Sequence, residues 1–128
     1  MLWRKALKYR TSILVVCAIT YVSLFREVHV SLPPVEGIDK WIHGLMYMIL
    51  ALTLLWDSQQ AGLGQTTKRT VAIAFSIAYG GMIEILQEQF FFPRTGDWLD
   101  WAADCIGVGV GVLIWITGKN WYARRMDK

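Results

Sequence analysis

Three polar residues repeat at every fourth position near the middle of the chain: Asp39, His43 and Tyr47. Residues four apart share one face of a helix, so a helix here would present a carboxylate, an imidazole and a phenol in one line. Lys40 follows Asp39 directly. An imidazole near carboxylates suits general acid or base catalysis, and it equally suits a structural hydrogen bond. The role of His43 therefore depends on the other polar residues it meets.

Two further helical faces combine carboxylates with small residues, which let helices approach closely. One face ends at Glu84, and the other holds Asp100 and Asp104. The small residues are Ala72, Ser76 and Gly80 on the first face, and Ala103, Gly107 and Gly111 on the second. Such stripes are commonly no more than helix packing, but packing alone does not account for the acids. We expect these two helices to pair and to direct their carboxylates into one seam.

Placing these acids in a membrane is costly. A charge at mid-bilayer costs about 2.5 to 3.5 kcal/mol, whereas each Leu, Ile or Val contributes only about 0.3 to 0.6 kcal/mol of favourable insertion energy. The helix that carries Asp100 and Asp104 would therefore insert only with a partner. Ionisable groups within membranes usually face the bundle interior and pair with one another. We predict that His43, Glu84, Asp100 and Asp104 meet from three helices.

The composition is that of a membrane protein. Hydrophobic residues make up 55% of the 128 residues and charged residues only 18%, against roughly 25% charged in soluble domains. Four apolar runs approach the roughly 20 helical residues that cross a bilayer; they cover residues 11–25, 41–56, 70–86 and 98–117. The chain is too short for two ordinary domains. We predict one all-α domain over residues 1–128, a four-helix transmembrane bundle.

Basic residues predict how these helices are oriented, because short loops rich in Lys and Arg stay in the cytoplasm. Ten of the 13 Lys and Arg residues precede the first run, separate the second from the third, or follow the fourth. Both termini are therefore expected in the cytoplasm, with the chain passing several times through a bacterial-type cytoplasmic membrane. A basic leader before an apolar run is also typical of a signal peptide. No small-residue cleavage site follows Phe25, so we expect a retained helix.

The polar residues resemble, in order and spacing, the motifs of the VanZ-like membrane proteins, a family named for an accessory protein of glycopeptide-antibiotic resistance. The motif positions are Asp39, Lys40, His43, Tyr47, Glu84, Gln87, Arg94, Asp100, Asp104 and Gly107, within residues 39–116. Asp104 departs from the family, which commonly has asparagine there, and it adds a charge or a proton to the seam. The resemblance implies a small four-helix membrane protein with its motif residues near the outer face. It implies no reaction.

Two functions fit these residues, and we favour the first because no nucleophile with an adjacent base stands out. The first is a binding module whose seam recognises a lipid headgroup or an amphipathic cell-envelope ligand, with a link to glycopeptide-antibiotic tolerance. The second is a membrane enzyme that acts on a lipid-linked substrate. His43 and Glu84 would be its acid and base, Asp100 and Asp104 orienting groups or metal ligands, and Lys40 and Arg94 would hold an anion. The residues assigned to binding are Asp39, Lys40, Tyr47, Gln87, Arg94 and Asp104.

No metal or other cofactor is assigned to the seam. Its side chains offer nitrogen and oxygen ligands, yet no close spacing such as His-Glu-x-x-His occurs. The net charge is only +3 and no nucleic-acid-binding motif is present, so no nucleic-acid partner is expected. Four short helices leave little room for a transport path unless several copies assemble. The expected partners are a membrane lipid or lipid-linked envelope molecule and, as a further option, other copies of the chain in a homo-oligomer.

Overall fold

The computed structural model describes residues 2–25, 37–92 and 95–127, and all regular structure within these ranges is helical. In chain order the elements are α1 (Leu2–Ala6), η1 (Leu7–Tyr9), α2 (Arg10–Thr20), η2 (Tyr21–Phe25), α3 (Ile38–Gln60), α4 (Gln65–Phe90) and α5 (Trp98–Met126). Four helical stretches are long and apolar enough to cross a membrane: Leu2–Phe25, Ile38–Gln60, Gln65–Phe90 and Trp98–Met126. The prediction of an all-α chain with four helices of spanning length is confirmed for these residues.

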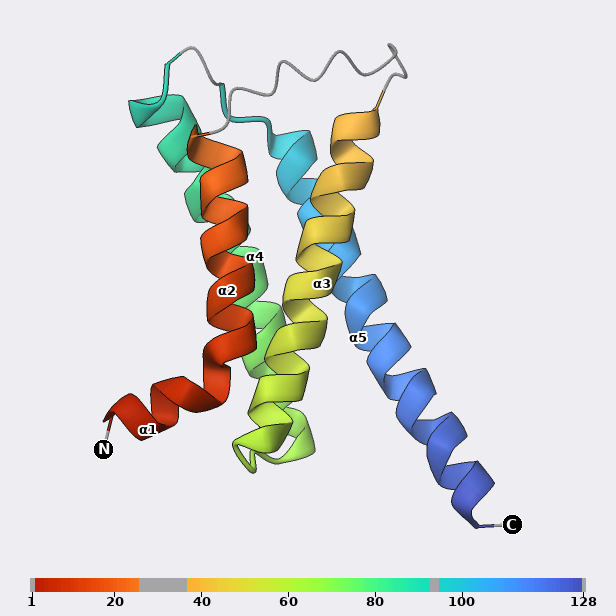
Figure 1. Cartoon of the computed structure of the whole chain (residues 1–128). Coiled ribbons are helices and arrows are strands. Elements are labelled where there is room, and N and C mark those ends of the chain that lie inside the picture. Colours follow the sequence, from red (N-terminus) through yellow and green to blue (C-terminus); the bar gives the residue numbers. More distant parts are fainter. Residues whose placement is uncertain (1, 26–36, 93–94, 128) are drawn as a thin grey trace.

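The helices extend beyond the apolar runs that predicted them. For example, α4 begins at Gln65 rather than at residue 70, and α5 continues to Met126 rather than to residue 117. Polar residues continue a helix as well as apolar ones do, so an apolar run marks only the segment that suits a bilayer. The first span is interrupted at Tyr9, whose backbone leaves the helical region at φ −104° and ψ 19°, and α1 turns away from α2 there (Figure 1).

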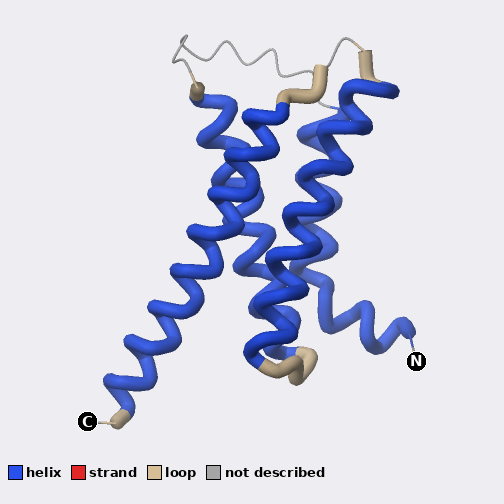
Figure 2. Tube along the Cα trace, turned by 180° about the vertical axis from the view of Figure 1, so that it is seen from behind, coloured by secondary structure: helices blue, strands red, loops and turns tan. Residues whose placement is uncertain are grey.

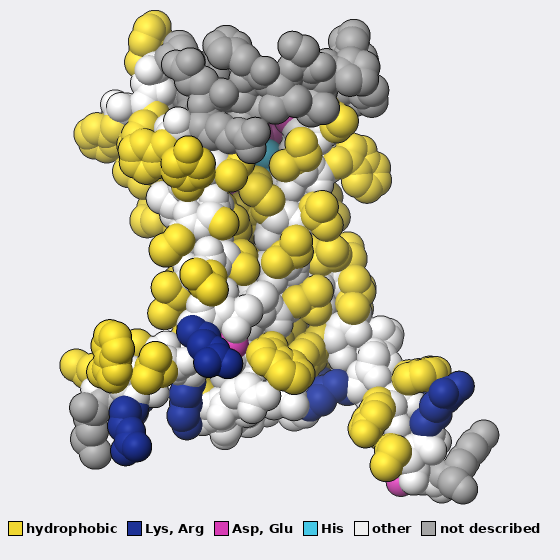
Figure 3. All heavy atoms as spheres, in the orientation of Figure 1, with side chains coloured by type: hydrophobic (Ala, Val, Ile, Leu, Met, Phe, Trp, Pro, Cys, Tyr) yellow, Lys and Arg dark blue, Asp and Glu magenta, His cyan; other side chains and the backbone are white. Residues whose placement is uncertain are grey.

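Both termini and the short α3–α4 connection lie at the same end of the bundle (Figures 1 and 2), which we call the terminus end. Gly62 ends α3 in a left-handed conformation, with φ 82°, and its N–H donates to the carbonyl of Gln59 at 3.0 Å. Such a glycine is a common helix stop. Hydrophobic side chains cover the middle of the molecule, and Lys and Arg side chains gather at the terminus end (Figure 3).

Helices α3 and α5 form the most extensive helix pair. A Cβ atom at Gly107 would overlap the backbone of Gly44, and one at Gly111 would lie 2.9 Å from the carbonyl oxygen of Met48. These glycines therefore let the two backbones touch. We expected the small residues of both stripes to pair this helix with the helix of Glu84; α4 and α5 do pack together, but Gly107 and Gly111 face α3. Gly44 supplies the matching gap on α3, and that pairing allows a closer approach than α4 offers.

Hydrogen bonds between side chains attach the first span to the rest of the bundle. The Tyr79 hydroxyl on α4 donates to the carbonyl of Val16 at 3.1 Å, and it lies 2.5 Å from the hydroxyl of Thr20. Toward the terminus end, Asp57 on α3 accepts the N–H and the O–H of Ser12, both at 2.8 Å. These bonds fix α2 against α3 and α4, so α4 is held in place beside the α3–α5 pair.

Candidate functional site

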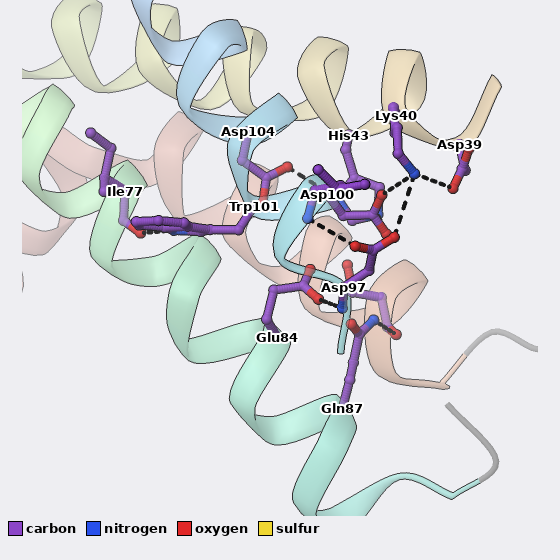
Figure 4. Close-up of polar contacts among 12 residues, drawn as sticks. Asp39, Lys40, His43, Ile77, Glu84, Gln87, Asp97, Asp100, Trp101 and Asp104 are labelled. Atoms are coloured by element: carbon purple, nitrogen blue, oxygen red, sulfur yellow. Dashed lines mark hydrogen bonds and ion pairs between the residues drawn. The ribbon is translucent and has the colours of Figure 1, made fainter. Parts of the chain in front are cut away.

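Four ionisable side chains meet at the end of the bundle away from the termini, which we call the far end (Figure 4). They are His43 on α3, Glu84 on α4, and Asp100 and Asp104 on α5, and we call them the polar site. One ligand atom from each of His43, Glu84 and Asp104 lies within 4.8 Å of the other two. The structure thus brings together from three helices the side chains that the sequence predicted to meet.

The contact between His43 and Asp104 is the shortest within the polar site. Their Nδ1 and Oδ1 atoms are 3.0 Å apart, and His43 Nε2 is 3.8 Å from Asp100 Oδ2. This geometry follows from the helix packing, because His43 adjoins Gly44, where α3 touches α5. Asp104 lies three residues before Gly107, on the same face of α5. The close backbone approach therefore brings the imidazole and the carboxylate within hydrogen-bonding distance.

Glu84 and Asp104 are each only 1% exposed, yet their carboxylates are incompletely paired. Glu84 Oε2 accepts the backbone N–H of Asp97 at 2.7 Å. Among the residues that the structure describes, Glu84 Oε1 and Asp104 Oδ2 have no hydrogen-bond partner, and neither has the nearby hydroxyl of Tyr47. Leaving a buried polar group unpaired costs about 1–3 kcal/mol, and more for a charged group. The site therefore has unused capacity to accept hydrogen bonds or to bind a cation.

Lys40 lies at the rim of the polar site and is engaged by three carboxylates. Its ammonium nitrogen is 3.3 Å from Asp100 and 3.4 Å from both Asp39 and Asp97. Among the described residues, the polar site and its rim together hold five carboxylates against one lysine and one histidine. The expectation that Lys40 would hold an anion therefore meets an obstacle, since its charge is already neutralised by its neighbours.

The remaining predicted residues take different positions. Tyr47 is buried, with 1% of its surface exposed, and Asp39 is largely exposed at 59% of its side chain. Gln87 is buried, but its amide donates to the carbonyl of Ser23 at 2.9 Å, so it ties α4 to η2. Arg94 lies outside the described residues. Of the binding residues predicted from sequence and described by the structure, Asp104 is thus one of the two buried carboxylates, and Tyr47 is buried near it.

Two residues that sequence reasoning left outside the site help to build it. Asp97 caps α5 by accepting the N–H of Leu99 at 2.8 Å, while its own N–H donates to Glu84. An aspartate directly before an apolar helix is a recognised start signal, so this residue could have been found. Trp101 donates its indole N–H to the carbonyl of Ile77 at 3.0 Å and joins α5 to α4. No local pattern reveals that contact.

A glycine on α4 makes room for the buried carboxylate. A Cβ atom at Gly80 would lie 3.0 Å from Asp104 Oδ2 and 3.2 Å from the ring of Tyr47. Both contacts are tighter than ordinary packing allows. The small-residue stripe of α4 therefore contributes to the site directly, because it leaves space beside the unpaired oxygen of Asp104.

The three converging side chains also form a plausible donor set for a divalent metal ion. One nitrogen and two carboxylate oxygens suit zinc and other first-row metals. Ligand atoms in tetrahedral contact with one zinc ion lie about 3.4 Å apart, so a span of up to 4.8 Å would have to contract. The sequence predicted that these side chains meet and that they offer metal ligands, but it showed no local metal-binding motif, since they come from three separate helices.

Comparisons with known proteins identify no relative of this chain. No protein-family model, no curated protein and no solved structure matches it. The resemblance to the VanZ-like proteins therefore remains a prediction based on the motif residues. What the site does must be argued from its own geometry.

Proposed function

We propose that this protein is a multi-pass membrane protein, similar to the VanZ-like family, whose polar site binds the headgroup of an amphipathic cell-envelope molecule. The observation that carries the proposal is the pair of buried, incompletely paired carboxylates, Glu84 and Asp104. Buried polar groups in proteins are nearly always hydrogen-bonded. A bound headgroup would supply the partners that the described residues lack.

The charge of the site limits the kind of headgroup. The free atoms of Glu84 and Asp104 are acceptors, and Lys40 is already held by three carboxylates. A bare phosphate would be repelled by this negative surplus, whereas hydroxyl or ammonium groups would donate to it. The proposed ligand therefore presents N–H or O–H donors, as a sugar or an ethanolamine headgroup does.

A groove beside the polar site supports an amphipathic ligand. It lies between α3 and α5, has a volume of about 380 Å³ and begins at Lys40 and Trp41. Its remaining lining is apolar, and includes Met48 and Val110. A groove of this kind suits a hydrocarbon chain, since it offers no polar partners along its length. A headgroup at the polar site would thus have space for its tail alongside.

The location of the ligand follows from the basic residues. Because Lys and Arg gather at the terminus end, the positive-inside rule favours both termini in the cytoplasm. The polar site would then open near the outer leaflet of a bacterial-type cytoplasmic membrane. A role in tolerance of glycopeptide antibiotics would fit that location, and it rests on the family resemblance alone.

Lipid retention tests this proposal with matched ligands and matched variants. The purified protein is equilibrated with phosphatidylethanolamine, phosphatidylcholine, a glycosyl diacylglycerol or phosphatidylglycerol, and the retained lipid is measured by native mass spectrometry. For the part of the retention that is lost in Glu84→Gln, we expect ethanolamine and sugar headgroups to exceed choline, which has no N–H or O–H donor, and phosphatidylglycerol, whose net negative charge the carboxylates repel. Glu84→Gln should weaken retention about tenfold or more, as expected for loss of a charge-assisted bond. Glu88→Gln, an exposed change on the same helix, should leave it unchanged.

Three outcomes would overturn the proposal. The first is that the retention lost in Glu84→Gln is equal for all four lipids, and the second is an equal effect of Glu84→Gln and Glu88→Gln. The third is one tightly held metal ion per chain that disappears in Glu84→Gln, because such an ion would occupy the acceptors assigned to the headgroup. Elemental analysis of the same preparations detects that third outcome.

A second candidate function is favoured by the contact between His43 and Asp104. A carboxylate that bonds one imidazole nitrogen fixes the ring and stabilises its protonated form, which suits acid or base catalysis on a lipid-linked substrate. Glu84 would be the second acid or base. Mass analysis of the lipids after incubation separates the candidates. Chemical change that stops in His43→Gln supports an enzyme, and recovery of unmodified lipid supports binding alone.

A further inference from the structure

A second cluster of charge lies at the terminus end and plays no part in the proposed headgroup site. Lys68 on α4 and Lys119 on α5 both donate to the same side-chain oxygen of Gln59, at 3.1 and 2.7 Å. Lys68 is 3% exposed, although lysine is almost never fully buried unless it is paired. Two ammonium groups that share one neutral acceptor lie within about 6 Å of each other. Their mutual repulsion needs an explanation.

No acid in the described part of the chain neutralises this pair. The ion pairs formed there all involve Lys40 or His43. The neighbouring charges that act on Lys68 are those of Lys119 and Arg69, which are also positive. Asp57, the buried acid of this region, accepts both of its hydrogen bonds from Ser12. The buried Lys68 and the half-buried Lys119 therefore form a positive centre without a counter-charge among the described residues.

The same region holds further unused donors. Arg69 Nε and the indole N–H of Trp115 are buried, and neither has a hydrogen-bond partner among the described residues. The ring of Trp115 lies 5.7 Å from the ammonium of Lys68 and 5.5 Å from that of Lys119. Donors thus outnumber acceptors here, which is the reverse of the polar site. We call Gln59, Lys68, Arg69, Trp115 and Lys119 the basic cluster.

We propose that the basic cluster binds a phosphate-bearing anion. Lysine and arginine donors around a phosphate give strong, charge-assisted hydrogen bonds, and basic pockets between membrane helices are known places for anionic lipid headgroups. The phosphate could belong to an anionic phospholipid of the adjoining leaflet or to a soluble phosphate compound. Either source supplies the negative charge and the acceptors that the cluster lacks.

Burial distinguishes this site from ordinary attraction between basic residues and lipid headgroups. Lys5 on α1 is exposed, whereas Lys68 is buried and Lys119 is half-buried. An exposed lysine contributes a screened and non-specific attraction. Lys68 and Lys119 would contact a bound anion directly. The effect of replacing either lysine on anion binding should therefore depend on its position as well as on its charge.

The experiment compares two sources of phosphate and three variants. The whole protein is placed in phosphatidylcholine vesicles with or without phosphatidylglycerol, and separately in detergent that is titrated with inorganic phosphate. Binding is followed by native mass spectrometry and by the midpoint of thermal unfolding. We expect the anion to raise the midpoint, and Lys119→Gln to weaken binding about tenfold. Lys5→Gln should change binding less than twofold, and Lys119→Arg should retain most of it.

The results distinguish a lipid headgroup from a soluble phosphate compound, and they show whether the basic cluster binds an anion at all. Binding of phosphatidylglycerol that excess phosphate does not displace identifies a lipid headgroup, and binding of phosphate alone identifies a soluble ligand; both support the site. Lys119→Gln is preferred to a change at Lys68, whose burial makes folding sensitive to replacement. The proposal is overturned if neither anion raises the midpoint, or if Lys5→Gln and Lys119→Gln weaken binding equally. Neither result would affect the headgroup proposal, which concerns the far end.

Discussion

Both ends of the bundle bury carboxylates, but among the described residues only the far end encloses carboxylate oxygens that have no hydrogen-bond partner. At the terminus end Asp57, 3% exposed, accepts two hydrogen bonds from Ser12. At the far end Glu84 and Asp104, each 1% exposed, retain an oxygen with no partner in the described ranges. Burial alone therefore does not identify a functional acid. The proposed headgroup site rests instead on the oxygens of Glu84 and Asp104 that folding leaves without a partner among the described residues.

The largest effect is expected from removing the paired carboxylate. Asp57→Ala leaves the buried N–H and O–H of Ser12 without an acceptor, and hydrogen bonds to charged groups contribute about 1.5–3 kcal/mol each. We expect the free energy of unfolding to fall by about 3 kcal/mol, measured by denaturation in detergent micelles. Asp127→Ala, at an exposed acid, is the control. If Asp57→Ala and Asp127→Ala were equally stable, Asp57 would not be structural. The contrast between the acids at the two ends of the bundle would then fail.

A somewhat smaller effect is expected where α3 touches α5 near the far end. Gly107→Ala places a Cβ atom against the backbone of Gly44, and overpacking of this kind costs about 1–3 kcal/mol. We expect a less stable protein that retains less headgroup lipid. At Gly109 an added Cβ would meet nothing within 4 Å, so Gly109→Ala should be neutral in the same assays. If Gly107→Ala retains lipid normally, the site does not depend on this helix contact.

The incompletely paired carboxylate should give a different result from Asp57. Glu84→Gln keeps an oxygen that can accept the N–H of Asp97, and it removes a buried charge. We expect the free energy of unfolding to stay the same or to rise by about 1 kcal/mol, although headgroup retention falls. A loss of about 2 kcal/mol or more in the ligand-free protein would place Glu84 with Asp57 among the structural acids.

The smallest effect is expected at the rim of the polar site. Lys40 is 35% exposed in its side chain, and exposed ion pairs contribute about 0–1 kcal/mol. Lys40→Met should lower stability by less than about 1 kcal/mol, and the loss should grow at low salt, where the three carboxylates repel one another more strongly. Lys40→Arg should match the unmodified protein. A stability loss that is independent of salt would show that Lys40 acts through packing rather than charge.

Much of the fold was predictable because hydrophobic length determines it. Four apolar runs predicted four helices, and the fourfold spacing of Asp39, His43 and Tyr47 placed them on one helix of the structure. The pairing of helices was not predictable in the same way. Small residues lie on both α4 and α5, and the sequence alone does not determine which helix each set of small residues packs against. Only the three-dimensional match of Gly44 with Gly107 decides it.

The polar site was partly predictable for a related reason. Buried charge is costly, so His43, Glu84 and Asp104 stood out against their apolar surroundings and were expected to meet. Asp97 could be recognised from sequence as the start of α5, but its hydrogen bond to Glu84 comes from the backbone N–H, which every residue except proline has. The basic cluster was missed because lysines near a membrane boundary suggest orientation only. That Lys68 is buried depends on Trp115 and Gln59 from other helices.

The opposite character of the two ends gives the folded chain a permanent dipole along the bundle axis. In a membrane whose inner side is electrically negative, each elementary charge moved across contributes about 2.3 kcal/mol per 100 mV. If the four helices span such a membrane, the orientation with the lysine-rich end inside has the lower energy. Transmembrane voltage would then favour this orientation of the folded protein over the inverted one.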